Sequence, residues 1–189
     1  MSKILKEEQV FNDFFTVLKA QVTYKGVDSK KDITATRLCL ERGDSVAVLL
    51  FEKDTDSFLF TKQYRYPSAR REKPIMVELV AGSLTQGENP QECARREVKE
   101  ELGYEVKTMQ LITTYFPSPG GCSEQIHLFY SEVDTTAKIQ KGGGVETEQE
   151  SIELVKIPKS EIRDKLQSGF FNNSISIIGL QWYLLSQRI

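Results

Sequence analysis

Apolar and polar residues alternate along the first part of the chain, and this pattern predicts β-structure. Residues 18–25 place apolar side chains on one face and polar side chains on the other, as in a half-buried strand. A turn-like stretch follows, and residues 33–40 return as a second strand. We therefore expect a small antiparallel β appendage over residues 1–43, joined to a main domain over residues 44–189.

The main domain alternates short apolar runs with charged or glycine-containing turns. Strands are predicted over residues 45–51, 57–63, 76–80, 110–115, 124–131 and 152–157. Helices are predicted over residues 90–102, 159–167 and 174–186, the last of which is expected to pack against sheet. Strands mixed with helices on both sides predict an α/β fold, with a mixed sheet in an α/β/α sandwich.

The helix over residues 90–102 carries its own start and stop signals. Asn89 can cap the first free amides, Pro90 fits the first helical position, and Gly103 is a natural end. The apolar positions recur every four residues, at Ala94, Val98 and Leu102. This stripe is expected to face the core.

Three glutamates, Glu97, Glu100 and Glu101, share the neighbouring face of this helix. Like charges four residues apart, such as Glu97 and Glu101, destabilise an isolated helix by roughly 0.2–0.5 kcal/mol. Two carboxylates ~6 Å apart repel by roughly 3 kcal/mol at an effective dielectric of about 20, so a convergent cluster calls for a cation. Oxygen ligands alone suit Mg²⁺ or Mn²⁺. The alternative is a solvated charged face, neutralised by basic residues of the same helix.

Composition and charge exclude several classes of function. The chain has 189 residues, with 25 Lys and Arg against 27 Asp and Glu, and a formal net charge of −2. The chain lacks the net positive charge expected of a nucleic-acid-binding protein and the polybasic run expected of a membrane-surface protein. The expected partner is therefore a small molecule. The sequence has no apolar run of 18 residues and no signal-peptide stretch, so neither membrane insertion nor export is expected.

The cysteines and the single histidine narrow the chemistry further. Cys39, Cys93 and Cys122 are odd in number and lack CxxC or disulfide-framework spacing, which indicates reduced structural thiols and a cytoplasmic protein. His127 is the only histidine and falls within a predicted strand. A His-based triad and a multi-histidine zinc site are therefore excluded.

The strongest functional signal is the segment 82–104, which reads GSLTQGENPQECARREVKEELGY. Its specified positions are Gly82, Glu88, Arg96, Glu97, Glu100, Glu101 and Gly103, with Val98 and Tyr104 at the apolar ones. With these residues at these spacings, the segment resembles the Nudix box, the signature of hydrolases that cut diphosphates linked to another moiety. The resemblance implies the Nudix α/β/α sandwich and a carboxylate-held metal site that neutralises the diphosphate and activates water.

The resemblance also implies roles for single residues. Glu97 and Glu101 would be the principal metal ligands, Glu100 would support them, and the backbone carbonyl of Ala81 would add an oxygen. Arg96 would hold and orient the carboxylates through its planar fork of donors. The implied cofactor is Mg²⁺, for which Mn²⁺ can substitute.

Residues around the box resemble one branch of the family. Residues 80–82, 118–121 and 173–182 look like the ADP-ribose pyrophosphatases, which act on nucleoside diphosphate sugars. The glycine run at residues 142–144, followed by Val-Glu, looks like the subgroup that prefers GDP-mannose. Sequence alone therefore leaves the base and the sugar open.

In this branch a loop opposite the helix supplies further glutamates. By resemblance, Glu148 matches the water-activating base and Glu150 matches an additional metal ligand. A shift of two residues would make Glu146 the base instead. The alternative is an acidic solvated loop with no role in catalysis.

Four more residues are implied to bind substrate. Arg65 would contact the substrate phosphates, and Glu124 would lie at the sugar or phosphate end. Family members commonly dimerise by exchanging their N-terminal strands, so the resemblance implies a homodimer in which Arg37 and Arg42 reach an active site. Each of these arginines could instead be an ordinary solvated side chain.

Together these observations predict a cytoplasmic, Mg²⁺-dependent pyrophosphatase that converts a nucleoside diphosphate sugar to a nucleoside monophosphate and a sugar phosphate. ADP-ribose is the first candidate substrate and GDP-mannose the second. The non-enzymatic alternative is a Nudix domain that senses ADP-ribose without cutting it. Such domains typically lose box glutamates, whereas this sequence keeps all of them.

Overall fold

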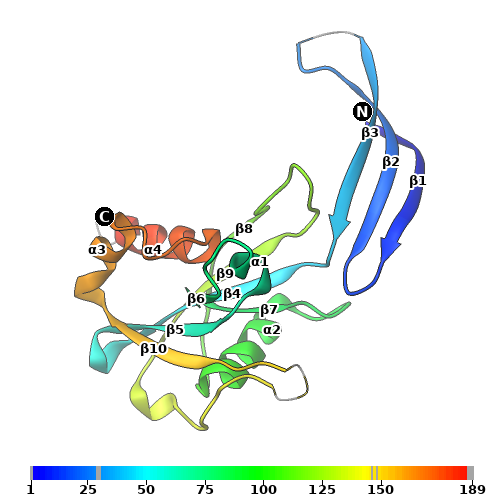
Figure 1. Cartoon of the computed structure of the whole chain (residues 1–189). Helices are drawn as coiled ribbons and strands as arrows, with labels where there is room; N and C mark the ends of the chain where they lie inside the picture. The colour runs from blue at the N-terminus through cyan, green and yellow to red at the C-terminus, as the bar shows by residue number, and fades with distance from the viewer. Residues whose placement is uncertain (1, 29–30, 146, 148, 187–189) are drawn as a thin grey trace. The chain divides into compact units, whose positions relative to one another are not determined.

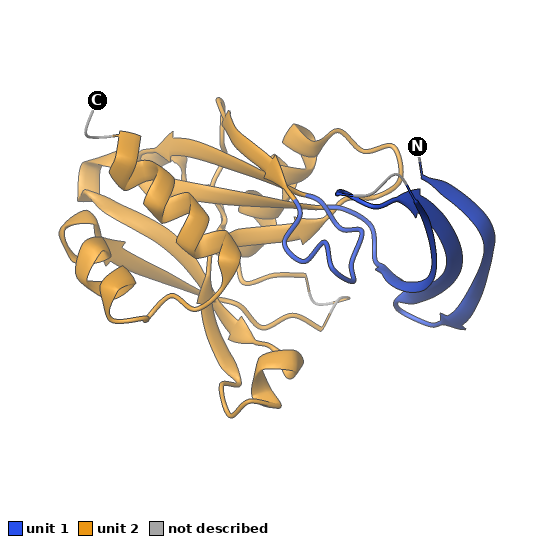
Figure 2. Cartoon of the chain, turned by 90° about the horizontal axis from the view of Figure 1, so that it is seen from above, with its two compact units in different colours: residues 1–44, 116–125 blue, residues 45–115, 126–189 orange. Residues whose placement is uncertain are grey.

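The chain folds as two compact units (Figure 2). Unit 1 comprises Met1–Asp44 and Phe116–Gln125, and unit 2 comprises Ser45–Tyr115 and Ile126–Ile189. The computed structural model describes residues 2–28, 31–145, 147 and 149–186.

Unit 1 is built on a three-stranded antiparallel sheet with β2 in the middle (Figure 1). Its strands are β1 (Lys3–Asn12), β2 (Thr16–Lys25) and β3 (Asp32–Glu41). The two predicted N-terminal strands and their antiparallel pairing are thereby confirmed. The sequence pattern does not predict β1, because every residue of β1 is exposed and a strand without a buried face needs no apolar alternation.

Unit 2 is built on a seven-stranded mixed sheet (Figure 1). The strand order is β10-β5-β4-β9-β8, with β6 beside β5 and β7 beside β4. The pairing of β4 with β9 is parallel, and β4 pairs antiparallel with β5 and β7. The strands are β4 (Ser45–Glu52), β5 (Ser57–Tyr64), β6 (Ile75–Glu78), β7 (Val80–Ser83), β8 (Gln110–Tyr115), β9 (Ile126–Val133) and β10 (Glu153–Pro158).

Among the residues that the structure describes, the helical elements belong to unit 2. The α-helices are α1 (Tyr66–Ala69), α2 (Pro90–Glu97), α3 (Ile162–Gln167) and α4 (Ser174–Ser186). Short 3₁₀ turns are η1 (Lys53–Thr55), η3 (Thr135–Ala137) and η5 (Lys159–Glu161), and the π-helical segment η2 (Val98–Leu102) continues α2. No helix in the described part of the chain is long and apolar enough to cross a membrane.

Helices cover both faces of the sheet in unit 2. The central strand β4 is buried at every position, as expected of a continuous apolar run. Alternate residues from Val46 onward belong to a core that contains Ala94 of α2 and Val98 of η2. The residues between them belong to a second core, which contains Ile162 of α3 and Leu180 of α4. The predicted α/β/α sandwich is confirmed.

One strand predicted from the sequence, over residues 76–80, is in fact two strands. β6 pairs with β5 and β7 pairs with β4, so the chain crosses between neighbouring strands at Leu79. The Leu79 side chain is buried, and its backbone N–H donates to Ser176 Oγ of α4 over 3.3 Å. A side chain of α4 therefore satisfies the amide at the break.

The helix of the box segment begins and ends where the sequence predicts. Asn89 Oδ1 accepts hydrogen bonds from the N–H groups of Gln91 (2.8 Å) and Glu92 (3.4 Å), and Pro90 is the first helical residue. Gly103 ends the helix with a φ of +80°. Its last turn is π-helical, a difference that the spacing of the apolar stripe does not reveal. Such turns are rare and occur frequently at functional sites.

Candidate active site

The carboxylate of Glu97 lies against the backbone of β7. A Cβ atom added at Gly82 would lie 2.0 Å from both Cδ and Oε1 of Glu97. A side chain at this position would require Glu97 to move away, so glycine lets the helix carboxylate approach the strand closely. This contact gives a steric reason for the first glycine of the box segment.

Glu101 is the most deeply buried carboxylate of the box segment, at 2% exposed. Its Oε2 accepts a hydrogen bond from the N–H of Ala81 over 3.3 Å. Burial raises the pKa of Glu101 well above its ordinary value, and the negative charges of Glu97 and Glu150 raise it further. A bound cation would offset both the burial and the carboxylate neighbours that disfavour the ionised form of Glu101.

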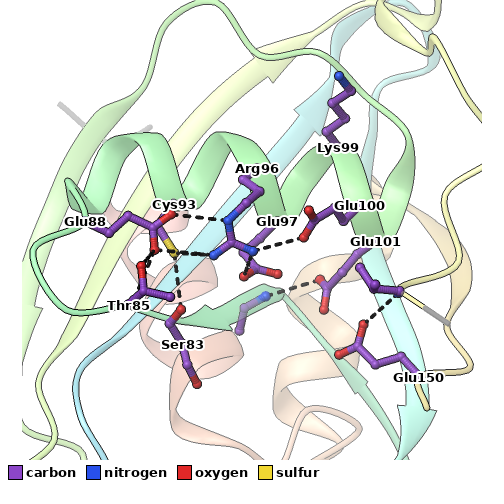
Figure 3. A network of polar contacts seen from close by, with 12 residues as sticks. Ser83, Thr85, Glu88, Cys93, Arg96, Glu97, Lys99, Glu100, Glu101 and Glu150 are labelled. Atoms are coloured by element: carbon purple, nitrogen blue, oxygen red, sulfur yellow. Dashed lines mark hydrogen bonds and ion pairs between the residues drawn. The ribbon is translucent and has the colours of Figure 1, made fainter. Parts of the chain in front are cut away.

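Glu97 and Glu150 complete a cluster of three carboxyl groups with Glu101 (Figure 3). Burial raises the pKa of Glu97 to about 7; the Arg96 guanidinium opposes this rise, and the charges of Glu100 and Glu150 add to it. Glu150 comes from the segment before β10, and its side chain lies next to Glu101 (Figure 3). The cluster therefore joins two parts of the chain that are distant in sequence.

Arg96 holds the glutamates around it in place (Figure 3). Its Nη1 lies 2.7 Å from Glu97 Oε1 and 3.0 Å from Glu100 Oε2, and its Nε lies 3.2 Å from Glu88 Oε1. The N–H of Thr85 and the Arg96 guanidinium together lower the pKa of Glu88 to about 2. Glu88 is therefore ionised and fixes both the loop before α2 and the arginine that orients the other carboxylates.

The donor set suits a hard divalent cation. Among the residues that the structure describes, no three His, Cys, Asp or Glu side chains are already arranged around a common metal position. Glu97, Glu101 and Glu150 nevertheless supply only oxygen donors, which Mg²⁺ and Mn²⁺ prefer, and their mutual repulsion favours the entry of a cation. The side chains would need to rotate toward a bound ion.

The loop glutamates are only partly accounted for by the described residues. Glu150 Oε2 accepts a hydrogen bond from the N–H of Val145 over 3.2 Å. Glu148 and Glu146, the two candidates for the water-activating base, lie outside the residues that the structure describes.

Arg65 lies beside the same cluster in unit 2. Its Nε is 2.8 Å from Glu78 Oε2, and its charge acts on the Glu101 carboxyl group. Sequence reasoning does not single out Glu78. The sequence feature that could have indicated Glu78 is its position as the one charged residue in the apolar run IMVELV at residues 75–80.

The other three predicted substrate-binding residues lie in unit 1. Arg42 Nη1 is 3.7 Å from Glu124 Oε2, so these two residues meet in that unit. Arg37 donates to Tyr24 Oη over 2.9 Å and to the carbonyl of Thr36 over 3.0 Å, which places it on the three-stranded sheet.

Comparison with known proteins identifies the family of this chain. The model of the NUDIX domain matches residues 41–168. The chain belongs to the Nudix family. Its Nudix box is the loop and helix that carry Gly82, Glu97 and Glu101, and Nudix proteins of this type generally use a divalent metal, in agreement with the oxygen-only donor set.

Relatives with assigned activities align with almost the whole Nudix chain. An ADP-ribose pyrophosphatase of Haemophilus influenzae is 33% identical, over 97% of this chain and 86% of its own length. A GDP-mannose pyrophosphatase of Cronobacter sakazakii is 31% identical, over 94% of this chain and 92% of its own length. A solved structure, of an ADP compounds hydrolase, superposes with a TM-score of 0.73 at 19% identity, covering 99% of this chain and 94% of that one. This last likeness supports the fold.

Proposed function

We propose that the protein is a Mg²⁺-dependent pyrophosphatase that hydrolyses a nucleoside diphosphate sugar to a nucleoside monophosphate and a sugar phosphate. The convergence of Glu97 and Glu101 from the box helix with Glu150 from the segment before β10 carries this proposal. Buried oxygen ligands whose charges repel one another suit a divalent cation. The two named pyrophosphatase relatives support the substrate class.

The chain's own residues have separate tasks in the proposed reaction. Glu97, Glu101 and Glu150 would hold Mg²⁺, with the carbonyl of Ala81 as a further oxygen and Glu100 in support. An ion held by these residues would neutralise diphosphate oxygens and make a bound water more acidic. Arg96 keeps Glu97 and Glu100 aimed through its ion pairs.

Attack by water on one phosphorus forms a new P–O bond and breaks the bridging P–O bond, so one phosphate leaves with each product. Glu148 would take the proton from the attacking water, with Glu146 as the alternative base. Arg65 would bind the phosphates, because its guanidinium lies beside the carboxylate cluster and presents several donors.

ADP-ribose is the proposed substrate, and GDP-mannose is the second candidate. The relative from Haemophilus influenzae is named for ADP-ribose and aligns over 97% of this chain. The relative from Cronobacter sakazakii is named for GDP-mannose, and the glycine run at residues 142–144 also favours that sugar nucleotide. A sensor without hydrolase activity is disfavoured because the box retains every glutamate.

A homodimer through unit 1 extends the proposal. The three-stranded sheet and its β1–β2 turn expose large apolar side chains, including Ile4, Phe11, Phe14 and Leu38. A second copy of the same sheet is a suitable partner, because isologous pairing buries the same patch on both subunits. In such a dimer Arg37, Arg42 and Glu124 would contribute to substrate binding. We place the dimer in the cytoplasm, since the cysteines are free thiols.

The test is a parallel incubation of the purified protein and Mg²⁺ with ADP-ribose, GDP-mannose and ADP-glucose, with products resolved by chromatography. Release of AMP or GMP by the native protein, and not by Glu101→Gln, is the expected result and identifies the substrate. No product from any of the three, together with measurable binding of one, would support the sensor instead.

A further inference from the structure

The glycine run at residues 142–144 is packed against the end of the box helix. The N–H of Gly143 donates to the carbonyl of Glu101 over 2.9 Å, and the N–H of Gly144 donates to the carbonyl of Glu100 over 3.1 Å. The last carbonyls of a helix lack partners within the helix. Here the N–H groups of Gly143 and Gly144, from a segment further along the chain, are those missing partners.

Close backbone contact at this place requires glycine on both sides. A Cβ added at Gly142, where φ is +72°, would lie 2.6 Å from the carbonyl oxygen of Glu101. A Cβ added at Gly103 would lie 2.1 Å from the carbonyl oxygen of Gln140. Neither obstacle is a flexible side chain, so a substitution at Gly142 must separate the two backbones.

The same glycines hold the segment that carries Glu150. Gly143 donates to the helix through its N–H and accepts, through its carbonyl, from the N–H of Ile152 over 3.1 Å. A Cβ added at Gly144 would lie 2.7 Å from both Cβ and Oε2 of Glu150. Gly143 thus bridges the last helical turn, which carries Glu101, and the strand entry that follows Glu150.

We propose that Gly142, Gly143 and Gly144, the glycine bridge, are positioning residues that set the Glu150 carboxylate against Glu101 so that helix and loop form one metal site. This inference rests on the proposed function, which supplies the metal. The bridge acts only through backbone groups, so its loss should reduce metal affinity and turnover without removing any ligand.

A matched pair of variants separates positioning from simple backbone strain. Gly142→Ala introduces both an unfavourable φ and a clash with the helix carbonyls. Gly169→Ala introduces a similar strain, because φ at Gly169 is +73°, but its Cβ meets nothing within 4 Å and the residue lies in the α3–α4 connection. Both variants should lose comparable thermal stability from backbone strain, because each places alanine at a positive φ.

The readouts are Mn²⁺ affinity by calorimetry and the separate kcat and KM for the substrate. We expect Gly142→Ala to weaken Mn²⁺ binding by about 10-fold and to lower kcat by about 100-fold, with KM nearly unchanged. Gly169→Ala should retain the native affinity and kcat. A folded Gly142→Ala protein that matches Gly169→Ala in both quantities would overturn the proposal.

Hydrogen exchange of the native protein gives a decision even where Gly142→Ala does not fold. The amides of Gly143 and Gly144 should become more protected when Mn²⁺ binds, because the ion joins the two segments that the bridge connects. Unchanged protection in protein shown to contain bound Mn²⁺ would refute the inference. A native protein that neither binds Mn²⁺ nor hydrolyses substrate would refute the proposed function instead.

Discussion

The Glu97 carboxylate occupies the space that a side chain at Gly82 would fill, with 2.0 Å between Glu97 Cδ and a Cβ added at that glycine. Glycine at this point of β7 is therefore a condition for the position of a proposed metal ligand on α2.

Gly82→Ala should displace Glu97 and reduce kcat by about 100-fold, because a misplacement of about 1 Å has effects of that size. Ser83→Ala, at the exposed next position of β7, is the matched control and should keep native turnover. Steady-state kinetics with circular dichroism as a folding check measures the effect. Equal kcat in the two variants would contradict the steric argument.

Arg96→Lys should lower kcat or metal affinity by about 10–100-fold, the range typical of residues that orient metal ligands. Lysine keeps the charge but cannot contact Glu97, Glu100 and Glu88 together from one planar group. Kinetics at several Mg²⁺ concentrations measures the loss. Arg95→Lys alters the neighbouring pair with the exposed Glu92, which does not involve Glu97, Glu100 or Glu88, and should leave the kinetics unchanged.

Glu52 should link stability to pH in a site remote from catalysis. The carboxylate is buried and accepts hydrogen bonds from Tyr104 (2.5 Å), Thr55 (2.5 Å) and Lys156. Burial opposes ionisation, but the hydrogen bonds from Lys156, Thr55 and Tyr104 outweigh it and hold the pKa of Glu52 below its ordinary value. The stabilisation is therefore complete above the unfolded pKa of 4.5 and is lost as pH falls through the folded-state pKa.

Glu52→Gln should lower the free energy of unfolding by about 1–3 kcal/mol at neutral pH, because it leaves buried donors poorly matched. The difference from native protein should shrink as pH falls below about 4. Urea unfolding across this pH range measures it. Glu153→Gln, which removes an exposed carboxylate paired with Lys62, should change stability by less than about 1 kcal/mol.

Phe11→Glu should convert the proposed homodimer to monomer, because it places a charge in the exposed apolar surface of β1. Gln9→Glu adds the same charge to β1 without removing an apolar side chain, and should leave the dimer intact. Light scattering coupled to size-exclusion chromatography gives the mass. A native protein that is monomeric at micromolar concentration would count against the dimer itself.

The sequence predicts well those elements whose buried residues form a strong pattern. Its predictions are less accurate where an element depends on contacts between distant segments. The buried run of β4 and the apolar α4 are recovered almost to the residue, since burial leaves a pattern in the sequence. β1 is missed because both its faces are exposed. The division between β6 and β7 at Leu79 is missed because apolar residues continue on both sides of the break.

The same contrast holds within the candidate site. Spacing alone brings Glu97 and Glu101 to one face of one helix, since both belong to a single continuous segment. The ion pair of Arg65 with Glu78 and the contact of Gly142 with the helix end depend on pairing between separate segments. No local pattern reports such pairings, so the structure was needed to find them.

The parallel pairing of β4 with β9, which joins Ser45–Glu52 to Ile126–Val133, has a consequence for the order of folding. Such pairing between distant segments forms slowly, because a long loop must close first. The segment with Glu150 follows β9 in the chain. During synthesis, the Nudix box is therefore complete well before Glu150 can join Glu97 and Glu101. We therefore expect the nascent protein to acquire its metal only after synthesis of the whole sheet.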